Sequence, residues 1–249
     1  MDKRAGDRKS DAERDEPIRS LQPAAADYLA AVGRAVAGVA PFIGGAVGEL
    51  ITHGIPNQRI DRIVRFVEVL DKKAAHLDDE LVRTQLTNEN FTDVLEEGIA
   101  QAARSLTDER REYIASLLAT GLSKDQVDYS QTKHLLRILG EINDVEVIIL
   151  RSYAVATIGG DVEFREKHKA VLEYEPPLLG SSVEVVDNAA IQTSYREHLA
   201  NLGLLSRRYR SNDRTDPFGT RLETQGHDIT WLGRLLLRYV GISPEKIEK

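Results

Sequence analysis

Residues 57–86, NQRIDRIVRFVEVLDKKAAHLDDELVRTQL, decide the fold class because they carry a regular apolar pattern. Two sets of apolar residues recur at intervals of seven, one offset from the other by three: Ile60, Val67, Ala74 and Leu81, and Ile63, Leu70 and Leu77. Charged residues lie between them, and Asn57 after Pro56 can cap the start. The pattern predicts one helix over 57–86 whose apolar stripe forms a seam within a helical bundle. The alternative is a coiled coil with a second copy, which would make the protein a homo-oligomer.

Four more helical patterns follow, separated by short polar links, over 88–105, 107–123, 126–139 and 143–158. Thr107 and Asn143 can cap two of these helices, and Gly121 can stop the helix that Thr107 opens. The run VEVIIL has strand propensity, but the surrounding pattern favours a helix that ends at Gly159-Gly160. The residues predicted to face the core are Phe91, Val94, Leu95, Ile99, Ala102, Tyr113, Ile114, Leu117, Leu118, Leu135, Leu136 and Leu139. The sequence thus predicts an all-α fold built as a multi-helix bundle.

The composition limits the class of protein. A chain of 249 residues, 41% of them hydrophobic and 29% charged, can form one large domain or two small ones. The net charge of -7 argues against coating nucleic acid or anionic lipid, so any basic site must be local. The absence of cysteine excludes disulfides and thiolate sites and suits a reducing cytoplasm. Residues 1–20 mix charges of both signs, which predicts a disordered tail.

Residues 28–51, YLAAVGRAVAGVAPFIGGAVGELI, form a second distinctive segment, rich in alanine and glycine and nearly uncharged. Its uncharged part is shorter than the roughly 20 residues that a membrane-spanning helix needs, and Pro41 would kink a helix there. Ala40, Gly44 and Gly48 recur at intervals of four and leave one helix face flat. The length favours packing in the bundle, and membrane association is the alternative. The candidate membrane or packing residues are Ala40, Phe42, Ile43, Gly44 and Gly48.

The pattern changes at Pro176-Pro177, which we interpret as a boundary between a bundle over 21–175 and a C-terminal unit over 176–249. Within that unit the sequence predicts a helix, a strand, a polar turn, a second strand and an amphipathic helix, over 186–203, 206–210, 211–219, 220–224 and 228–241.

Two short motifs mark the ends of these elements. GLL at 203–205 ends the first helix, with Gly203 as a candidate left-handed C-cap, and TWLG at 230–233 opens the last, with Asp228 or Thr230 as its cap. Together these motifs resemble the end of many bacterial winged-helix domains, in which the wing lies between a Gly-Leu-Leu turn and a Thr-x-x-Gly start. The resemblance implies a winged-helix-like domain with a small two-stranded β-wing.

Sequence motifs for catalysis or cofactor binding are missing. The chain has no GxxxxGK[ST] phosphate loop, no HExxH and no nucleophile elbow. The six histidines are scattered, and neighbouring carboxylates such as Glu96 and Glu97 point about 100° apart on a helix, as on a solvated face. We therefore expect no catalytic, metal or cofactor residues, no small-molecule substrate and no enzyme activity.

One local basic patch remains. Arg207, Arg208 and Arg210 lie on the first predicted wing strand, and Arg196 lies on the helix before it. Arginines at these positions can contact DNA phosphates or belong to a charged wing used for protein contacts. The acidic net charge favours protein contacts over DNA.

The layout of a helical body with a Gly/Ala segment ahead of a wing-like end resembles bacterial abortive-infection proteins of the alpha type. That resemblance implies a role in defence against phage. The leading hypothesis is a non-enzymatic bacterial effector that acts through membrane association or self-association, in the cytoplasm or peripherally at the inner membrane. The alternatives are a cytoplasmic winged-helix DNA-binding regulator and a helical protein–protein adaptor.

Overall fold

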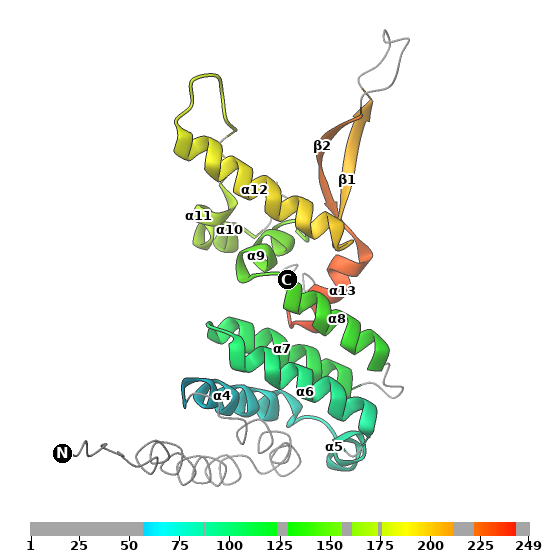
Figure 1. The fold of residues 1–249 in the computed structure, drawn as a ribbon. Helices are drawn as coiled ribbons and strands as arrows, with labels where there is room; N and C mark the ends of the chain where they lie inside the picture. The colour runs from blue at the N-terminus through cyan, green and yellow to red at the C-terminus, as the bar shows by residue number, and fades with distance from the viewer. Residues whose placement is uncertain are drawn as a thin grey trace, which may run out of the picture.

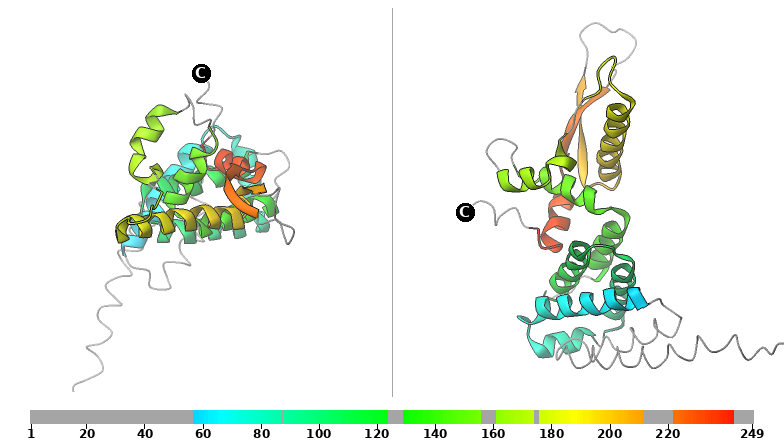
Figure 2. Two further views of the ribbon diagram at one scale, coloured as in Figure 1. Left: turned by 90° about the horizontal axis from the view of Figure 1, so that it is seen from above. Right: turned by 90° about the vertical axis from the view of Figure 1, so that its left-hand side faces the viewer.

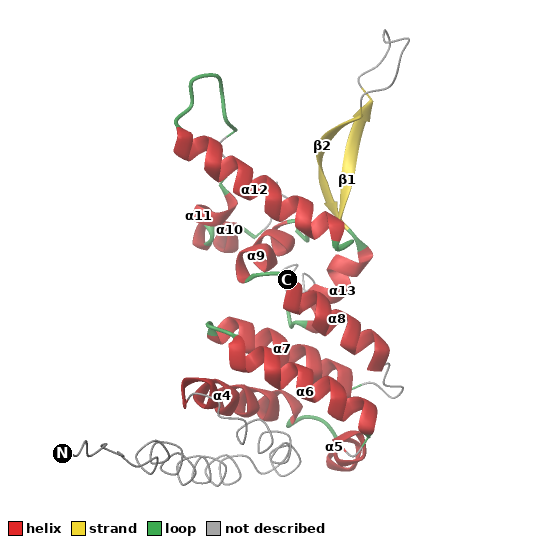
Figure 3. Ribbon diagram, in the orientation of Figure 1, coloured by secondary structure: helices red, strands yellow, loops and turns green. Residues whose placement is uncertain are grey.

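The computed structural model describes residues 57–86, 88–123, 129–155, 161–173, 176–211 and 222–242. Within these residues the chain forms ten helices and one two-stranded antiparallel sheet, so the predicted all-α class with a small hairpin is confirmed (Figure 3). The elements are α4 (Asn57–Ala74), α5 (Asp79–Leu86), α6 (Glu89–Arg104), α7 (Asp108–Leu122), α8 (Tyr129–Glu141), α9 (Asp144–Ser152), α10 (Val162–Lys167), α11 (Lys169–Leu172), α12 (Val183–Asn201), β1 (Leu205–Ser211), β2 (Leu222–Ile229) and α13 (Trp231–Tyr239). The predicted tail 1–20 and the segment 28–51, with its candidates Ala40, Phe42, Ile43, Gly44 and Gly48, lie outside the described residues.

Helices α4 to α8 form a bundle at one end of the molecule (Figure 1). At the other end, α12 and the hairpin β1–β2 diverge from the point where they meet, and α9, α10 and α11 lie beside α12. Helix α13 lies between the hairpin and the bundle, and Figure 2 shows the same arrangement from two further sides.

The single helix predicted over 57–86 is wrong, because the chain turns after Ala74 and starts a second helix at Asp79. The side chain of Asp78 explains the restart. Its Oδ1 accepts hydrogen bonds from the backbone N–H groups of Glu80 at 2.9 Å and Leu81 at 3.1 Å. These bonds satisfy donors at the start of α5 and favour a new helix over continuation of α4.

The apolar stripe of α4 is buried within the chain against α6 and α7. Its buried members are Ile60, Ile63, Phe66, Val67, Leu70 and Ala74. Leu77, in the turn after α4, is only half-buried. The predicted bundle seam is therefore present, and it ends where α4 ends.

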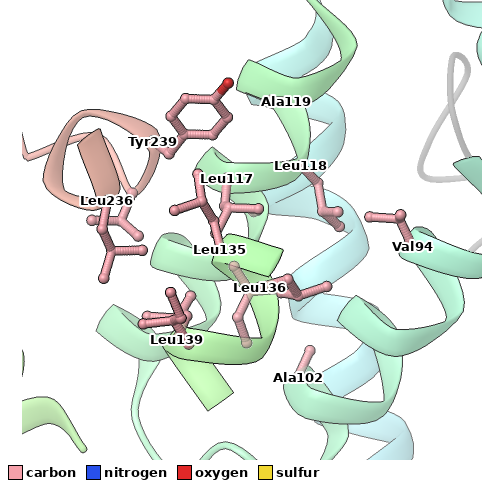
Figure 4. Close-up of a cluster of buried hydrophobic side chains, with 14 of the residues drawn as sticks. Val94, Ala102, Leu117, Leu118, Ala119, Leu135, Leu136, Leu139, Leu236 and Tyr239 are labelled. Atoms are coloured by element: carbon pink, nitrogen blue, oxygen red, sulfur yellow. The ribbon is translucent and has the colours of Figure 1, made fainter. Parts of the chain in front are cut away.

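The core continues through α6, α7 and α8 into α13. Asn88 and Thr107 cap α6 and α7 through their side chains, and the predicted cap at Thr107 is thereby confirmed. Leu236 and Tyr239 of α13 reach the side chains of Leu117 and Leu135, so the last helix completes the bundle core (Figure 4). All the residues predicted to face the core are buried except Tyr113, which is half-buried.

Gly121 does not stop α7, which runs on to Leu122. A Cβ atom at Gly121 would lie 2.9 Å from the Cγ2 of Thr132, and the glycine therefore allows α8 to approach closely. The predicted C-cap is wrong because the helix needs this residue for packing rather than for a left-handed turn.

Helix α9 forms despite the strand propensity of VEVIIL. Asn143 and Glu146 make a reciprocal capping box: the Asn143 side chain accepts from the Glu146 N–H at 2.9 Å, and the Asn143 N–H donates to the Glu146 carboxylate at 2.8 Å. The helix ends at Ser152, earlier than the predicted Gly159-Gly160, and that glycine pair lies outside the described residues.

The order helix, strand, strand, helix is confirmed in the C-terminal unit. Gly203 has φ +75° and ends α12 in a Schellman turn, in which Leu204 N–H donates to Leu199 C=O at 2.9 Å. Strand β2 is longer than the predicted 220–224 and includes Asp228, so α13 begins at Trp231 with Thr230 as its cap.

The two motifs that carry the winged-helix resemblance contact each other. The Thr230 hydroxyl donates to Gly203 C=O at 2.7 Å and accepts from the Gly233 N–H at 3.0 Å. A Cβ on Gly233 would lie 2.4 Å from the Leu204 carbonyl oxygen, so this position requires glycine. The hairpin is therefore closed at its base by backbone contacts.

Candidate functional site

Arg207, a predicted nucleic-acid or partner residue, is partly exposed and binds side chains of α12. Its Nε donates to Glu197 Oε2 at 2.7 Å, and its Nη2 donates to Asn201. His227 of β2 lies 3.2 Å from the other Glu197 oxygen. The hydrogen bond from Arg207 holds the pKa of Glu197 below its usual range. This cluster anchors the hairpin to α12 and leaves Arg207 poorly placed to contact a ligand.

Arg196 is also engaged within the fold. Its Nη1 donates to Gln192 C=O at 2.6 Å, and its Nε donates to the Tyr153 hydroxyl at 3.2 Å. Arg208 is more exposed, with its Nε 3.7 Å from Asp228 Oδ2. Arg210 lies in β1 opposite Glu223. Of the four predicted residues, the structure brings Arg196 and Arg208 to one cleft.

This cleft has a volume of about 680 Å³ and lies where α9 to α13 and the hairpin meet. Its lining residues are Ser152, Tyr153, Ala154, Val155, Arg165, Leu172, Arg196, Arg208, His227, Asp228, Ile229 and Arg234. Two of its arginines, Arg165 and Arg234, were not predicted from the sequence. No linear signal marks them, because the four cleft arginines come from four separate elements.

Arg165 and Arg234 bind backbone carbonyls at the C-terminal end of α9 and just beyond it. Arg165 Nη2 donates to Ser152 C=O at 3.0 Å, and Arg234 Nη1 donates to Ala154 C=O at 3.3 Å. Cations are favourable at this end of a helix, where carbonyl groups lack partners. The Nε of Arg165 is buried and has no hydrogen-bond partner among the described residues.

A different surface lies at the free end of α12, which we call the apolar–acidic surface. Its residues are Leu178, Leu179, Val183, Glu184, Val186, Asp187 and Ile191. The five apolar members are all exposed, and Leu179 is completely exposed. Helix α12 buries only Ala189 and Leu199 among its 19 residues.

A third exposed group consists of Arg208 and Tyr209 of β1 and Trp231, the first residue of α13, and we call it the hairpin surface. The Trp231 side chain is 83% exposed and Tyr209 is 52% exposed. It combines aromatic side chains with a positive charge, whereas the apolar–acidic surface combines aliphatic side chains with negative charge.

The described residues also bear on metal and membrane sites. Among them, no three His, Asp or Glu side chains are placed to hold a metal ion. None of the helices that the structure describes is long and apolar enough to cross a bilayer. Comparison of the chain with protein-family models, curated proteins and solved structures finds no match.

Proposed function

We propose that this protein is a non-enzymatic effector that acts through self-association, with the apolar–acidic surface of one copy bound to the hairpin surface of the next. The observation that carries the proposal is the exposure of five large apolar side chains between Leu178 and Ile191. Monomeric proteins seldom leave such residues grouped at the surface, and grouped ones usually mark an interaction site. Each of these five side chains is at least 46% exposed in the part of the chain that the structure describes.

Charge selects the partner surface. Two copies joined symmetrically through the apolar–acidic surface would bring Glu184 and Asp187 near the same residues of the partner copy, which is unfavourable. The hairpin surface offers Arg208 with Tyr209 and Trp231, a match in both charge and apolar area. Head-to-tail contact of this kind leaves one unused surface at each end, so copies can add into rings or open chains.

Sedimentation velocity of two complementary variants tests the proposal. Glu184→Lys with Asp187→Lys reverses the charge of one surface, and Tyr209→Asp disrupts the other. We expect the wild type to form species larger than a dimer at high concentration and each variant alone to stay monomeric. A mixture of the two should form a one-to-one dimer that grows no further, because each copy keeps one intact surface.

The matched control for this experiment reverses two exposed carboxylates on the bundle, Glu96→Lys with Glu112→Lys, and should associate like the wild type. A wild type that stays monomeric, or surface variants that assemble like this control, would overturn the proposal.

The defence role implied by the layout resemblance adds a cellular test. If association produces the effect, cells expressing the wild type should reduce phage plaque formation, and the Glu184→Lys, Asp187→Lys variant should lose that protection. Protection that survives in the variant would separate the defence role from self-association.

The membrane-association hypothesis rests on residues 28–51 and is a separate proposal. Its test is flotation with liposomes, in which Val47→Lys should abolish binding because a charge within the hydrocarbon costs about 2.5–3.5 kcal/mol. Failure of the wild type to float would leave self-association without a lipid step.

A DNA-binding winged helix is the second candidate function, supported by the α12–hairpin–α13 order and the exposed Arg208. Helix α12, which would enter the major groove, carries Glu184, Asp187 and Glu197 against one arginine, Arg196. This charge opposes approach to phosphate, so self-association is the better-supported proposal.

A further inference from the structure

The cleft beneath the hairpin gathers positive charge in an acidic chain. Its lining contains four arginines and one carboxylate, Asp228, a formal charge of 4 − 1 = +3 with His227 neutral, whereas the whole chain carries -7. Like charges held together in a concave site repel each other, and an anion that enters relieves this repulsion. The charge of the lining therefore indicates an anionic ligand.

The arginines keep donors for such a ligand. Each guanidinium has five N–H groups. The cleft arginines Arg165 and Arg234 each use one nitrogen to bind a backbone carbonyl, which holds the guanidinium in place. Guanidinium groups fixed in this way match the geometry of phosphate oxygens, to which arginine can donate two parallel bonds.

The size and lining of the cleft define the rest of the ligand. A volume of about 680 Å³ falls within the range of roughly 300–1,000 Å³ typical of small-molecule sites and far exceeds a lone phosphate ion. Val155, Leu172 and Ile229, with Tyr153, supply an apolar portion of the wall. We propose that the cleft binds an organic phosphate, in which a phosphate group is joined to a flat or apolar body, as in a nucleotide.

This ligand would connect three separate elements of the protein. Arg208 belongs to the hairpin, Arg165 to the short helix α10 and Arg234 to α13. An anion bound by all three would hold the hairpin to the end of α9 and stabilise the folded protein by mass action. Ligand occupancy and hairpin position are thereby coupled.

Isothermal titration calorimetry with adenosine monophosphate, uridine monophosphate, glucose 6-phosphate and inorganic phosphate tests the proposal, with adenosine as the unphosphorylated match. We expect saturable binding of at least one organic phosphate, weaker binding of inorganic phosphate and none of adenosine. A second pair of titrations compares a 5′-phosphorylated oligonucleotide with the same oligonucleotide lacking the phosphate. Tighter binding of the phosphorylated strand than of any free nucleotide would identify a nucleic-acid end as the source of the phosphate.

Four variants assign the binding to the cleft. Arg208→Ala removes a charge at an exposed position. Arg165→Lys keeps the charge but loses the planar guanidinium that can donate two parallel hydrogen bonds. Each change should weaken binding by about tenfold or more. Arg238→Ala removes an exposed arginine of α13 outside the cleft and should bind like the wild type. Tyr209→Asp should also bind like the wild type. Arg208 belongs to both the cleft and the hairpin surface, so Tyr209→Asp is the variant that distinguishes ligand binding from self-association.

The proposal is overturned if no organic phosphate binds saturably below about 1 mM, a weak affinity for a specific site. It is also overturned if Arg208→Ala and Arg165→Lys both bind as tightly as Arg238→Ala, or if adenosine binds as well as its monophosphate.

Discussion

Helices α7 and α12 are similar in length but are used in opposite ways. Helix α7 buries nine of its 15 residues at the centre of the bundle, whereas α12 buries two of 19. Hydrophobic packing therefore stabilises the first, and polar bonds to neighbouring elements position the second. Glu197 binds Arg207, Arg196 binds Tyr153, and His198 Nδ1 lies 2.6 Å from the buried Glu146.

If the protein self-associates as we propose, this difference separates a structural part of the molecule from a contact part. A helix held at one end by polar bonds leaves its other end free to meet a partner, at a small cost in stability. The apolar–acidic surface occupies that free end. The following substitutions and changes of pH test this division, beginning with the largest expected effect.

Replacing Leu70 by Ala should destabilise the protein by about 2–5 kcal/mol, because its side chain is fully buried in the α4 seam and would leave a cavity. Val186→Ala removes an apolar side chain from α12 where it is 46% exposed, and should change stability by no more than about 0.5 kcal/mol. Urea denaturation followed by circular dichroism measures both. Equal losses would show that α12 is as much a part of the core as α4.

Gly233→Ala should destabilise the protein by about 1–3 kcal/mol, because its Cβ would meet the backbone oxygen of Leu204 at 2.4 Å and a backbone atom moves at high cost. The matched change Gly180→Ala lies ahead of α12, where a Cβ meets nothing within 4 Å but φ is +93°. It should cost about 1 kcal/mol from backbone strain alone. Thermal melts compare the two, and a larger loss at Gly180 would argue against the closed base of the hairpin.

Acidification should loosen the hairpin from α12. Glu197 has a lowered pKa in the folded protein, chiefly because Arg207 donates a hydrogen bond to its carboxylate. A carboxylate with a lowered pKa adds stability above its unfolded pKa, and this stability is lost as the pH falls through the folded pKa. The protection factors of the β1 amides, which compare each measured exchange rate with the intrinsic rate at the same pH, should therefore fall as the pH falls below the usual glutamate range.

The Glu197→Gln variant should show fast β1 exchange at neutral pH and lose the acid-dependent change. Glu184→Gln, an exposed glutamate on the same helix, serves as the control and should behave like the wild type. A protection factor in β1 that still falls with acid in Glu197→Gln would assign the effect to another group. Because Glu197 is partly exposed, solvent screening keeps the effect small.

The smallest effect is expected when the hairpin arginines are replaced and DNA affinity is measured. Arg208→Ala should reduce the slope of log affinity against log salt by about 0.9 if Arg208 contacts a phosphate. Replacing Arg207, Arg208 and Arg210 together also removes the Glu197 anchor, so this triple variant loosens the hairpin as well as changing its charge. We expect only weak, non-specific DNA binding in a filter or anisotropy assay. Submicromolar, sequence-selective binding at physiological salt would favour the regulator over the self-associating effector.

The features that sequence predicted correctly are local ones. Thr107, Asn143, Thr230 and Gly203 act within a few residues of their own positions, so each cap follows from its short neighbourhood. The restart at Asp78 was missed because the heptad pattern continues across it, although a local side chain breaks the helix. Local signals that agree with the periodicity can be predicted, and those that oppose it are harder to recognise.

The cleft could not be predicted because its residues meet only through tertiary packing. Arg196 and Arg208 were selected for a basic patch along the chain, whereas Arg165 and Arg234 join them only once α10 and α13 pack beside α9. The same packing occupies Arg207, which the chain pattern presents as one more exposed arginine. The short helices α10 and α11 were not predicted either, since they are too brief to show a period.

The insertion of Leu236 and Tyr239 into the bundle affects how the protein is made (Figure 4). The side chains they meet on α7 and α8 are synthesised about a hundred residues earlier, so a nascent chain holds an open apolar groove until α13 leaves the ribosome. Products that stop before Trp231 lack the helix that closes this groove and are natural targets for chaperones and proteases. Quality control would then remove incomplete copies before they could join an assembly.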